Sequence, residues 1–385
     1  MSISVRRELM GDDMLPEGSA VAHGPDAAGA LRVLMATRYG RLGASSRLRL
    51  LQYAPALERL GIECTARPFL SDAYVAALYG KGARLPSALA AYGRALGLAR
   101  AIRAHELIWI EKELLPFLPA ALERTLLGEK KFILDFDDAW FLRYQTGKSL
   151  PARWLLGGKF TDLVRRAALT VVANETLQDW ATQQGARAVL LLPTVVDLAQ
   201  YPVLPEPAGP FTVGWIGTPV TAPYLQAIEA PLRQLAREQP LELLVIGAPD
   251  LQISGVTCRH VPWSENAEAA LLGQCHVGVM PLSDDEWSRG KSGYKLVQYM
   301  AAGRATVASP VGANRTIVVD GVTGMLASDA AQWQSALRQL RDDPSLRSRM
   351  ALAARARAAS DYALSGTAPR LAAAMRLVAG QAGGP

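Results

Sequence analysis

The sequence predicts an α/β protein that contains two mostly parallel β-sheets. Short apolar segments of strand length alternate with longer helical segments over most of the 385 residues. This alternation is typical of parallel sheets covered by helices. The alternation stops at residues 202–210, where four of nine residues are proline, and then starts again. A chain of this length can form two ordinary α/β domains.

The first half opens with a buried strand at 32–37, a loop with glycine and serine at 38–46, and a helix at 47–60. A strand, a loop and a helix in this order begin a Rossmann-like unit, although the strict dinucleotide-binding fingerprint is absent. Further buried strands are expected in this half at 107–110, 131–135, 169–173 and 188–192.

The second half repeats the arrangement after the prolines. The elements expected there are strands at 211–216, 241–246, 276–280 and 305–309, and helices at 224–238 and 294–302. The proline-rich segment is expected to be a stiff linker between domains, with a surface loop inside one domain as the alternative. We therefore expect four parts: a mobile tail at 1–30, an N-terminal Rossmann-like domain at 31–204, a C-terminal Rossmann-like domain at 205–360, and a helical segment at 361–385.

Composition narrows the class of partner. The net charge of +6 and the pI near 9.3 suit an anionic partner such as a nucleotide or an acidic membrane surface. Nucleic acid is not expected, because the chain has no zinc-finger spacing, no long basic run and no interleaved aromatic and basic residues. Three widely spaced cysteines favour a reducing compartment over a disulfide framework. With no apolar run of 18 residues and no secretory signal, we expect a cytoplasmic protein, or one at the inner face of the membrane.

The most informative segment is 281–312, PLSDDEWSRGKSGYKLVQYMAAGRATVASPVG. Its residues Arg289, Gly290, Lys291, Ser292 and Gly293 are expected to open a helix. Glycines allow a ligand to approach the backbone closely, and the first amides of a helix bind anions. The combination suits a phosphate or diphosphate held without a metal. The alternative is a solvated basic loop before an ordinary helix.

The same segment carries a resemblance. It reads Lys291-x-x-x-Lys295-Leu-x-x-Tyr-Met-Ala-x-Gly, followed by Val307-Ala-Ser-Pro-Val-Gly312 and Asp320-Gly-x-x-Gly-x-Leu326. In this form it resembles the donor-binding segment of retaining, nucleotide-sugar-dependent glycosyltransferases of the GT-B fold, the large group that builds bacterial surface polysaccharides and glycolipids. The resemblance extends over about 32–362, and its other pieces lie at 43–49, 111–116, 135–138, 193–197 and 213–218.

The resemblance implies two Rossmann-like domains that face each other across a cleft. The C-terminal domain would bind a nucleotide-diphospho-sugar, and the N-terminal domain would present a saccharide or a lipid-linked acceptor. Transfer would proceed with retention and without a metal or a cofactor, and the last helix, after Asp361, would return to the first domain. Two alternatives are a sugar-nucleotide 2-epimerase of the same fold and a non-catalytic sugar-nucleotide-binding protein.

The chain departs from the family at two positions. Family members usually carry two glutamates around the helix at 294–302, and the matching positions here are Gly290 and Gln298. Gln298 can hydrogen-bond the donor without a charge, whereas Gly290 has no side chain to contact the sugar. Basic residues that often follow the first strand of the second domain are also missing from the loop at 217–223.

These considerations assign roles to individual residues. The cations expected to stabilise the leaving diphosphate, and therefore to act in catalysis, are Arg289 and Lys291. The donor-binding residues are expected to be Gly217, Thr218, Gly290, Ser292, Gly293, Tyr294, Lys295 and Gln298. For Gly217 and Thr218, the backbone amides are the expected phosphate ligands. The residues expected to face the acceptor or the sugar are Gly43, Arg47, Glu113, Asp137 and Asp138.

Several of these side chains have competing interpretations. Asp135, Asp137 and Asp138 could hold a metal, face a sugar across the cleft, or cap the next helix. Glu111 and Glu113 follow a strand, and an exposed loop is the simpler interpretation.

Arg47 and Arg49 could bind an acceptor phosphate or be solvated helix residues. The acids at 284–286 could contact the donor sugar or belong to a polar loop. Basic stretches at 94–103, 153–159 and 165–166 either lie on an anionic membrane surface or pack on the sheet.

Overall fold

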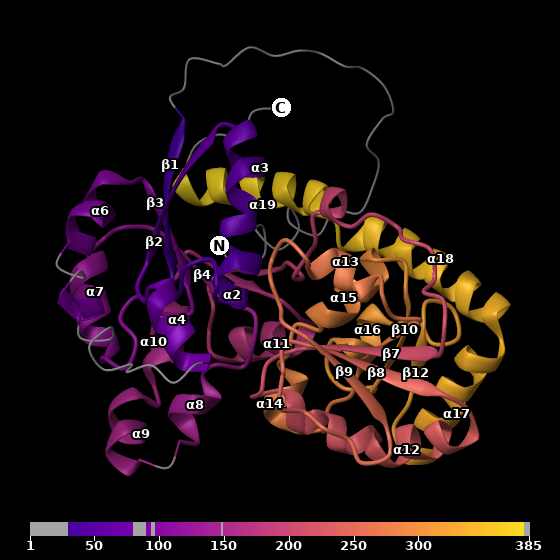
Figure 1. Cartoon of the computed structure of the whole chain (residues 1–385). Helices are drawn as coiled ribbons and strands as arrows, with labels where there is room; N and C mark the ends of the chain where they lie inside the picture. Colours follow the sequence, from indigo (N-terminus) through magenta and orange to yellow (C-terminus); the bar gives the residue numbers. More distant parts are fainter. Residues whose placement is uncertain (1–29, 80–89, 94–96, 148, 381–385) are drawn as a thin grey trace, which may run out of the picture. The chain divides into compact units, whose positions relative to one another are not determined.

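The computed structural model describes residues 30–79, 90–93, 97–147 and 149–380. Residues 31–385 form one compact unit, and the described part contains two six-stranded sheets, in which every pairing between named strands is parallel (Figure 1). The expected mobile tail lies outside the described residues. The two parallel sheets confirm the predicted fold class.

The first sheet has the strand order β2-β1-β3-β4-β5-β6. Its strands are β1 (Leu31–Thr37), β2 (Ile62–Pro68), β3 (Leu107–Glu111), β4 (Phe132–Phe136), β5 (Leu169–Val172) and β6 (Val189–Leu191). Neighbouring residues of β1 point to opposite faces: Leu34 belongs to one apolar cluster, while Val33 and Met35 belong to another. Because both faces of the sheet are covered, its central strands are mostly apolar.

The second sheet has the order β12-β11-β10-β7-β8-β9. Its strands are β7 (Phe211–Ile216), β8 (Leu241–Ile246), β9 (Thr257–Val261), β10 (Val277–Met280), β11 (Ala305–Ala308) and β12 (Met325–Leu326). The bounds of β7 and β8 are those expected from the sequence. The strands β2 and β9 were not expected, because both lie at sheet edges and carry charged residues among their apolar ones.

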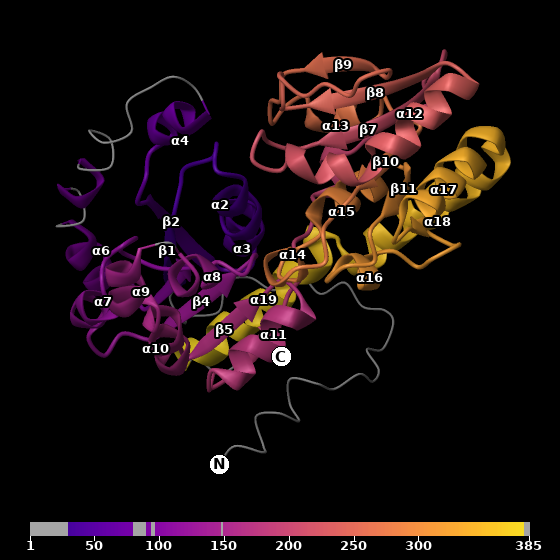
Figure 2. The same ribbon diagram turned by 90° about the horizontal axis from the view of Figure 1, so that it is seen from below.

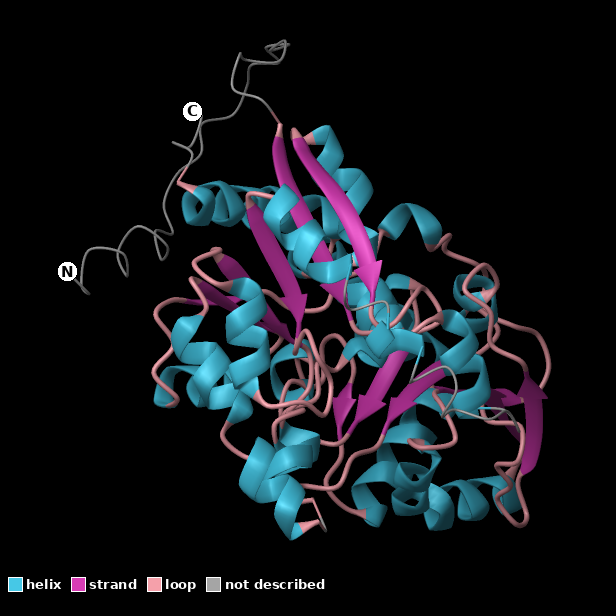
Figure 3. Ribbon diagram, turned by 90° about the vertical axis from the view of Figure 1, so that its left-hand side faces the viewer, coloured by secondary structure: helices cyan, strands magenta, loops and turns pink. Residues whose placement is uncertain are grey.

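Helices pack on the strands of each sheet (Figure 3). Those of the first half are α2 (Ala44–Arg49), α3 (Ala54–Arg59), α4 (Asp72–Tyr79), α6 (Leu98–Ala104), α7 (Ala120–Leu127), α8 (Leu142–Gln145), α9 (Leu150–Leu156), α10 (Lys159–Arg166) and α11 (Glu175–Gln183). Those of the second half are α12 (Glu229–Glu238), α13 (Glu268–Leu272), α14 (Glu286–Arg289), α15 (Tyr294–Ala301), α16 (Asn314–Ile317), α17 (Ala330–Asp342), α18 (Pro344–Asp361) and α19 (Leu364–Ala379). Short 3-10 helices occupy Leu51–Tyr53, Leu198–Gln200 and Ala222–Ile228.

Two expected helices are broken. The helix expected at 47–60 is divided into α2, a 3-10 turn and α3, with Pro55 at the start of α3. The helix expected at 224–238 begins as a 3-10 helix that contains Pro223 and becomes α12 only at Glu229. Proline has no N–H and is tolerated mainly in the first turn, so each proline starts a new helical segment.

The chain's last helix lies against the first sheet. Leu371 and Met375 of α19 share an apolar cluster with Leu31 and Trp109 (Figure 2). The Tyr53 hydroxyl also lies 3.1 Å from the Thr367 hydroxyl. The helix that follows Asp361 therefore packs on strands from the beginning of the chain.

The proline-rich segment is held at defined points. Glu206 pairs with Arg347 of α18 at 2.6 Å, and the Arg304 guanidinium donates to the carbonyls of Leu204 and Pro205. These contacts hold the proline-rich segment, which connects the two sheets along the chain, against the second half of the chain.

Candidate functional site

The segment expected to open a helix has a different local structure. Residues 286–289 form the short helix α14, whose first turn is capped by the Asp285 carboxylate, which accepts from the Ser288 N–H at 2.7 Å. Gly290 ends α14, and α15 begins only after Gly293. The expectation that 289–293 opens one helix is therefore wrong, because Asp285 supplies a cap for an earlier turn.

Gly293 has a backbone conformation that requires glycine. Its φ is +69°, and an added Cβ would lie 2.3 Å from Ile317 Cδ1. The left-handed conformation directs the chain into α15 with no side-chain cap at that end. The first amides of this eight-residue helix are therefore free of a side-chain cap, as an anion site requires.

The two expected catalytic cations lie in different surroundings. The Arg289 side chain is half exposed and binds Asp284 at 2.7 Å. Lys291 Nζ instead lies 5.6 Å from the ring centroid of Tyr224 and 5.5 Å from that of Trp287. In the described contacts, Arg289 is therefore already neutralised by a neighbour, and Lys291 is the cation held over aromatic rings.

Lys291 belongs to a charged group with Lys295 and Asp138. Lys295 Nζ lies 4.7 Å from the centre of the Trp215 ring. Burial and the charge of Lys291 lower the pKa of Lys295 to about 7, against the opposing effect of Asp138. Two neighbouring lysines, one of which has a lowered pKa, repel each other when both are charged. An added anion would stabilise the charged form of both side chains.

Asp138 approaches the lysines from the first half of the chain. Burial and the neighbouring Asp137 raise the pKa of Asp138, while Lys291 and Lys112 and a hydrogen bond from the Ser292 N–H oppose that rise. The structure therefore brings together Asp138, Lys291, Ser292 and Lys295 from the expected site.

Gly290 is in tight contact with the first half of the chain. A Cβ at this position would lie 2.5 Å from Ala139 Cβ and 3.0 Å from Ala139 N. The Asn174 side-chain amide donates to the carbonyls of Gly290 and Lys291 at 2.9 and 3.0 Å, and its oxygen caps α11 at Leu177 N. No side chain fits at Gly290 in this arrangement, which accounts for the absence of a glutamate there. Asn174 was not expected from the sequence, since only the fold brings it to this segment.

The backbone amides of Gly217 and Thr218 were expected to reach the phosphates, and the structure contradicts this. The Gly217 N–H donates to the Ile246 carbonyl at 3.0 Å and so extends the pairing of β7 with β8. The Thr218 N–H donates to the Thr221 hydroxyl at 3.1 Å. Both donors are therefore engaged locally in this structure.

Gln298 lies in a network that contains an unexpected glutamate. Gln298 is buried, and its side chain and that of Tyr294 hydrogen-bond the Tyr201 hydroxyl. Tyr201 donates in turn to Glu268 Oε1 at 2.8 Å, and the Trp263 indole donates to Glu268 Oε2 at 2.7 Å. The Glu268 carboxylate is thus linked to Gln298 through one residue, Tyr201. Its position depends on three separate segments of the chain, and the sequence gives no local signal for it.

The acids at the carboxyl ends of β3 and β4 are buried, and the expected exposed loop is wrong. The Glu113 side chain is fully buried and binds Arg38 at 2.5 Å and Lys159 at 2.7 Å. Glu111 accepts from the Ser46 hydroxyl at 2.5 Å and from the Arg38 N–H at 2.8 Å. Buried carboxylates require such partners, so these glutamates organise the loop after β3.

The neighbouring aspartates are also paired. Arg49 is buried and binds Asp135 at 2.8 Å, so neither a solvated helix position nor an acceptor-phosphate site describes Arg49. Lys112 binds Asp137 at 2.7 Å; although burial disfavours the Asp137 carboxylate, the Lys112 charge outweighs it and lowers the pKa of Asp137. Neither carboxylate caps α8, the next helix, which has no side-chain cap.

Gly43 and Arg47, expected to face the acceptor, are both buried. A Cβ at Gly43 would lie 2.4 Å from Tyr39 Cβ. The Arg47 guanidinium lies 4.6 Å from the centre of the Trp263 ring and 3.9 Å from Glu268. Arg47 therefore meets the network of Gln298 and Glu268 described above.

An aromatic and cationic stack joins α8 to α14. The Trp140 and Trp287 rings lie 6.2 Å apart, and the Arg143 guanidinium lies 4.1 Å from the first and 5.1 Å from the second. Arg38 lies 4.5 Å from the Trp140 ring. A cavity of about 490 Å³ beside this stack is lined by Leu142, Arg143, Thr146, Asp285, Glu286 and Trp287.

The histidines in the described ranges hold structural positions. His105 Nδ1 contacts the Ala101 carbonyl, His260 Nε2 contacts the Leu251 carbonyl, and His276 Nδ1 accepts from the Thr212 N–H. No group of three or more His, Cys, Asp or Glu in those same ranges is arranged to hold a metal. The described helices include none that is long and apolar enough to cross a bilayer.

Comparison with known proteins gives one matching family model. Residues 212–343 match the family model described as "Glycosyl transferases group 1". No curated protein matches the sequence.

Solved structures match over most of the chain. Sucrose-phosphate synthase from Thermosynechococcus elongatus is 16% identical with a TM-score of 0.66, covering 90% of this chain and 99% of the other. HepE of Anabaena, solved with UDP-glucose, is 14% identical with a TM-score of 0.62, covering 89% and 98%. A glycosyltransferase from Rickettsia africae is 11% identical with a TM-score of 0.63, covering 90% and 98%.

These matches confirm the GT-B fold expected from the sequence. The family match lies in the second half of the chain and includes Lys291, Lys295 and Gln298. The chain therefore has the GT-B fold, and its residues 212–343 match the glycosyl transferases group 1 family.

Proposed function

We propose that the enzyme transfers a sugar from a nucleotide-diphospho-sugar to a saccharide or lipid-linked acceptor, with retention of configuration, in the synthesis of a surface polysaccharide or glycoconjugate. Structures of the similar protein HepE are described with UDP, with UDP and glucose, and with UDP-glucose, which supports a nucleotide sugar as the donor. Retention and the biosynthetic role follow from the family resemblance.

The observation that carries the proposal is the group formed by Lys291, Lys295 and the start of α15. The group combines two ammonium groups with amides that lack a side-chain cap. A nucleoside diphosphate gains charge on its terminal phosphate as the bond to the sugar breaks. Fixed positive charges aimed at that phosphate stabilise the transition state more than the ground state.

Asp138 is the proposed sugar-facing or acceptor-facing group. Burial and Asp137 raise its pKa and Lys291 opposes that rise, and we propose that it lies beside the leaving phosphate. A carboxylate with a raised pKa can accept a hydrogen bond or a proton from a hydroxyl near neutral pH. Asp137 supports it from the same loop, while Lys112 fixes Asp137.

In this proposal the lysines and the helix amides supply all the positive charge, and neither a metal nor a cofactor takes part. Arg289 contributes less than Lys291, because Asp284 already neutralises it. Gln298 and Tyr294 contact the donor from the side of α15 that faces Tyr201, with Glu268 supplying the charge that Gln298 lacks.

The epimerase alternative predicts acid–base groups at the sugar. Each histidine of the described ranges is used to hold a helix end or a strand, and this favours transfer. The two reactions also differ in their products, since only transfer requires an acceptor other than water.

The proposed function is tested by a two-stage experiment. Thermal unfolding is first measured with UDP, GDP, ADP and dTDP and their sugars, because a ligand that binds the native state raises the Tm. The stabilising donor is then incubated with candidate acceptors, and the product's anomeric configuration is read by NMR. No stabilisation by any nucleotide sugar would contradict the proposal, and a changed sugar without transfer would favour the epimerase.

A further inference from the structure

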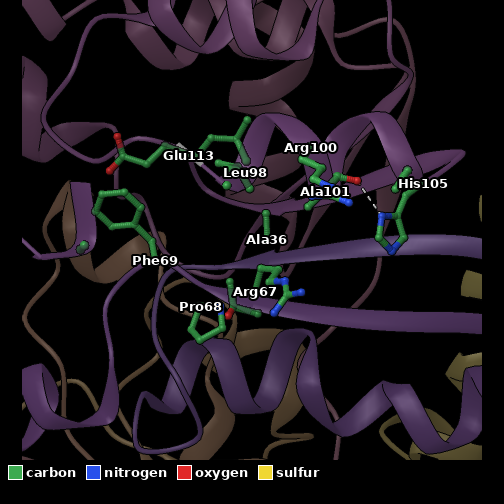
Figure 4. Close-up of a pocket in the computed structure, with 14 residues that line it drawn as sticks. Ala36, Arg67, Pro68, Phe69, Leu98, Arg100, Ala101, His105 and Glu113 are labelled. Atoms are coloured by element: carbon green, nitrogen blue, oxygen red, sulfur yellow. Dashed lines mark hydrogen bonds between the residues drawn. The ribbon is translucent and has the colours of Figure 1, made fainter. Parts of the chain in front are cut away.

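A cavity of about 620 Å³ lies in the first half of the chain, apart from Lys291 and Lys295. It is bounded by the carboxyl ends of β1 and β2, the segment after β3, and α6 (Figure 4). The apolar residues that line it include Ala36, Pro68, Phe69, Leu98, Ala101 and Leu114. A pocket of this volume with mostly apolar walls is typical of sites for small organic ligands.

The cavity also has a positive end. Figure 4 shows Arg100 and His105 toward one side of the view, with Phe69 and Glu113 toward the other. Arg67 and Arg100 both line the cavity and are exposed. Neither guanidinium has an ion pair or a hydrogen-bond partner among the residues that the structure describes.

The carboxylate in the lining does not neutralise these arginines. Glu113 is already bound by Arg38 at 2.5 Å and by Lys159 at 2.7 Å, and all three side chains are buried. The His105 ring contacts the Ala101 carbonyl through Nδ1. The uncompensated positive charge at the cavity is therefore carried by Arg67 and Arg100.

A buried polar atom at the same cavity has no partner. Thr37, at the end of β1, is 2% exposed, and its hydroxyl oxygen lacks a hydrogen bond within the described residues. Thr37 lines the cavity. Buried hydroxyls are normally paired, so Thr37 is a candidate partner for a ligand oxygen.

We propose that this cavity binds a single-chain amphipathic anion, with its hydrocarbon chain against the apolar wall and its phosphate or carboxylate on Arg67 and Arg100. Burial of the chain stabilises the complex in proportion to the apolar area removed from water. The arginine forks match the oxygens of either head group. A neutral saccharide would leave the apolar wall unused and both arginines unpaired.

This site is separate from the proposed donor-phosphate site at Lys291 and Lys295 and does not depend on it. No lining residue of the cavity belongs to the segment 289–298. Loss of anion binding should therefore leave nucleotide binding intact, and failure of the proposed function would leave this inference standing.

Binding is measured by titration calorimetry with decyl phosphate and with decanoate, each below its critical micelle concentration. Decanol and inorganic phosphate are the control ligands. We expect both decyl anions to bind more tightly than decanol, and inorganic phosphate to bind weakly or not at all. The stronger of the two decyl anions identifies the head group.

Variants then locate the site. Each of Arg67→Ala and Arg100→Ala should weaken decyl phosphate binding about tenfold or more, the effect of one lost charge-assisted hydrogen bond. Arg103→Ala is the matched control, since Arg103 is exposed on the same helix and does not line the cavity. Ala101→Phe should fill the cavity and reduce binding of both anions, with an unchanged Tm as the check on folding.

The outcomes separate the possibilities. Equal losses in Arg67→Ala, Arg100→Ala and Arg103→Ala would show only non-specific attraction to a basic surface and would overturn the proposal. The absence of binding by both decyl anions to the unsubstituted protein would overturn it as well. Unchanged affinity for nucleoside diphosphate in Arg67→Ala and Arg100→Ala would confirm that the two sites are separate.

Discussion

The Lys291 ammonium lowers the pKa of the Asp138 carboxyl, which burial and Asp137 raise. The two residues come from different halves of the chain. Asp138 follows β4 in the first half, and Lys291 follows α14 in the second half. A carboxyl and an ammonium group therefore influence each other near the start of α15, where the helix amides lack a side-chain cap. Removal of either charge should alter both the phosphate site and the carboxyl opposite it.

Lys291→Ala is expected to weaken nucleoside diphosphate binding about ten- to hundredfold, since a charge-assisted contact is worth roughly 1.5–3 kcal/mol. Transfer should fall further, because negative charge increases on the leaving phosphate in the transition state. Calorimetric titration with the diphosphate and an assay of its release measure the two effects. Arg289→Ala should have a smaller effect, and Lys131→Ala, at an exposed position before β4, is the control. Unchanged transfer in Lys291→Ala would remove this lysine from the mechanism.

Lys295 should couple diphosphate binding to proton uptake. Its pKa of about 7 in the free protein leaves the side chain mostly neutral at pH 8, and a bound phosphate would raise that pKa. Binding at pH 8 should therefore take up close to one proton, and binding at pH 6 almost none. Titrations in HEPES and in Tris, which differ in ionisation enthalpy, measure the uptake. Equal apparent enthalpies in the two buffers at pH 8 would contradict this role.

The same shift predicts how stability depends on pH. The pKa of Lys295 is lower in the folded protein than the 10.5 of a free lysine, so between about pH 7 and 10 the unfolded chain binds more protons. The contribution of Lys295 to stability should rise with pH over that range. Lys295→Met should remove this rise, and should stabilise the protein most at pH 6, where the native lysine is buried with its charge. Urea unfolding at pH 6 and pH 9 compares the two proteins.

Transfer is expected to continue in excess EDTA. The lysines and helix amides carry the positive charge in the proposed mechanism. Asp135 and Asp137 already form ion pairs with Arg49 and Lys112, so they are not free to bind a metal. The assay is run with EDTA and again after addition of magnesium or manganese. Loss of activity that either metal restores would show that Asp137 and Asp138 bind a metal and that the proposed charge stabilisation is incomplete.

The sequence predicted the buried strands well because their signal is local. The strands β7 and β8 have the expected bounds, since each is a mostly apolar run with a glycine or proline nearby. Edge strands were missed because only one face of β2 meets the core, and the run IECTARP has few apolar residues. Pro55 and Pro231 could have marked the breaks in two expected helices, and their missing N–H groups were given too little weight.

The candidate site was predicted less completely, because much of it depends on long-range contacts. Lys291, Lys295 and Asp138 were expected and meet, whereas Asn174 and Glu268 reach the site only through the fold. Local hydrogen bonds also remove donors that the sequence leaves free, as at Thr218. Burial of Glu113 could not be foreseen, since its partners Arg38 and Lys159 are far away in the chain.

Gln298→Glu, which restores the family residue, is expected to destabilise this protein. Gln298 and Glu268 both bind the Tyr201 hydroxyl, which has one proton to donate. A second carboxylate would be buried without a donor, at a cost of about 1–3 kcal/mol. The double variant Gln298→Glu with Glu268→Gln should recover most of that loss in urea unfolding. A fully stable Gln298→Glu protein would show that the two side chains do not share Tyr201.

Membrane association is expected to depend on α9 more than on the other basic stretches. Lys159 is buried by its ion pair with Glu123 at 2.6 Å, and the segment 94–103 is described only in part. On α9, by contrast, Leu150 is 71% exposed, Trp154 is 88% exposed and Leu155 is 51% exposed. Exposed tryptophan and leucine beside Arg153 are suited to the interface of an anionic bilayer.

Co-sedimentation with vesicles of phosphatidylglycerol and phosphatidylcholine tests this expectation. The protein should bind at low salt and less at high salt, because screening weakens the attraction of Arg153 while the apolar contacts of Trp154 remain. Trp154→Ala and Arg153→Ala should each reduce binding, and they should leave the Tm unchanged, because both side chains are exposed. Arg187→Ala, an exposed arginine away from α9, is the control. Binding that persists in Trp154→Ala but disappears in Arg187→Ala would place the membrane contact elsewhere, and no binding at low salt would favour a soluble acceptor.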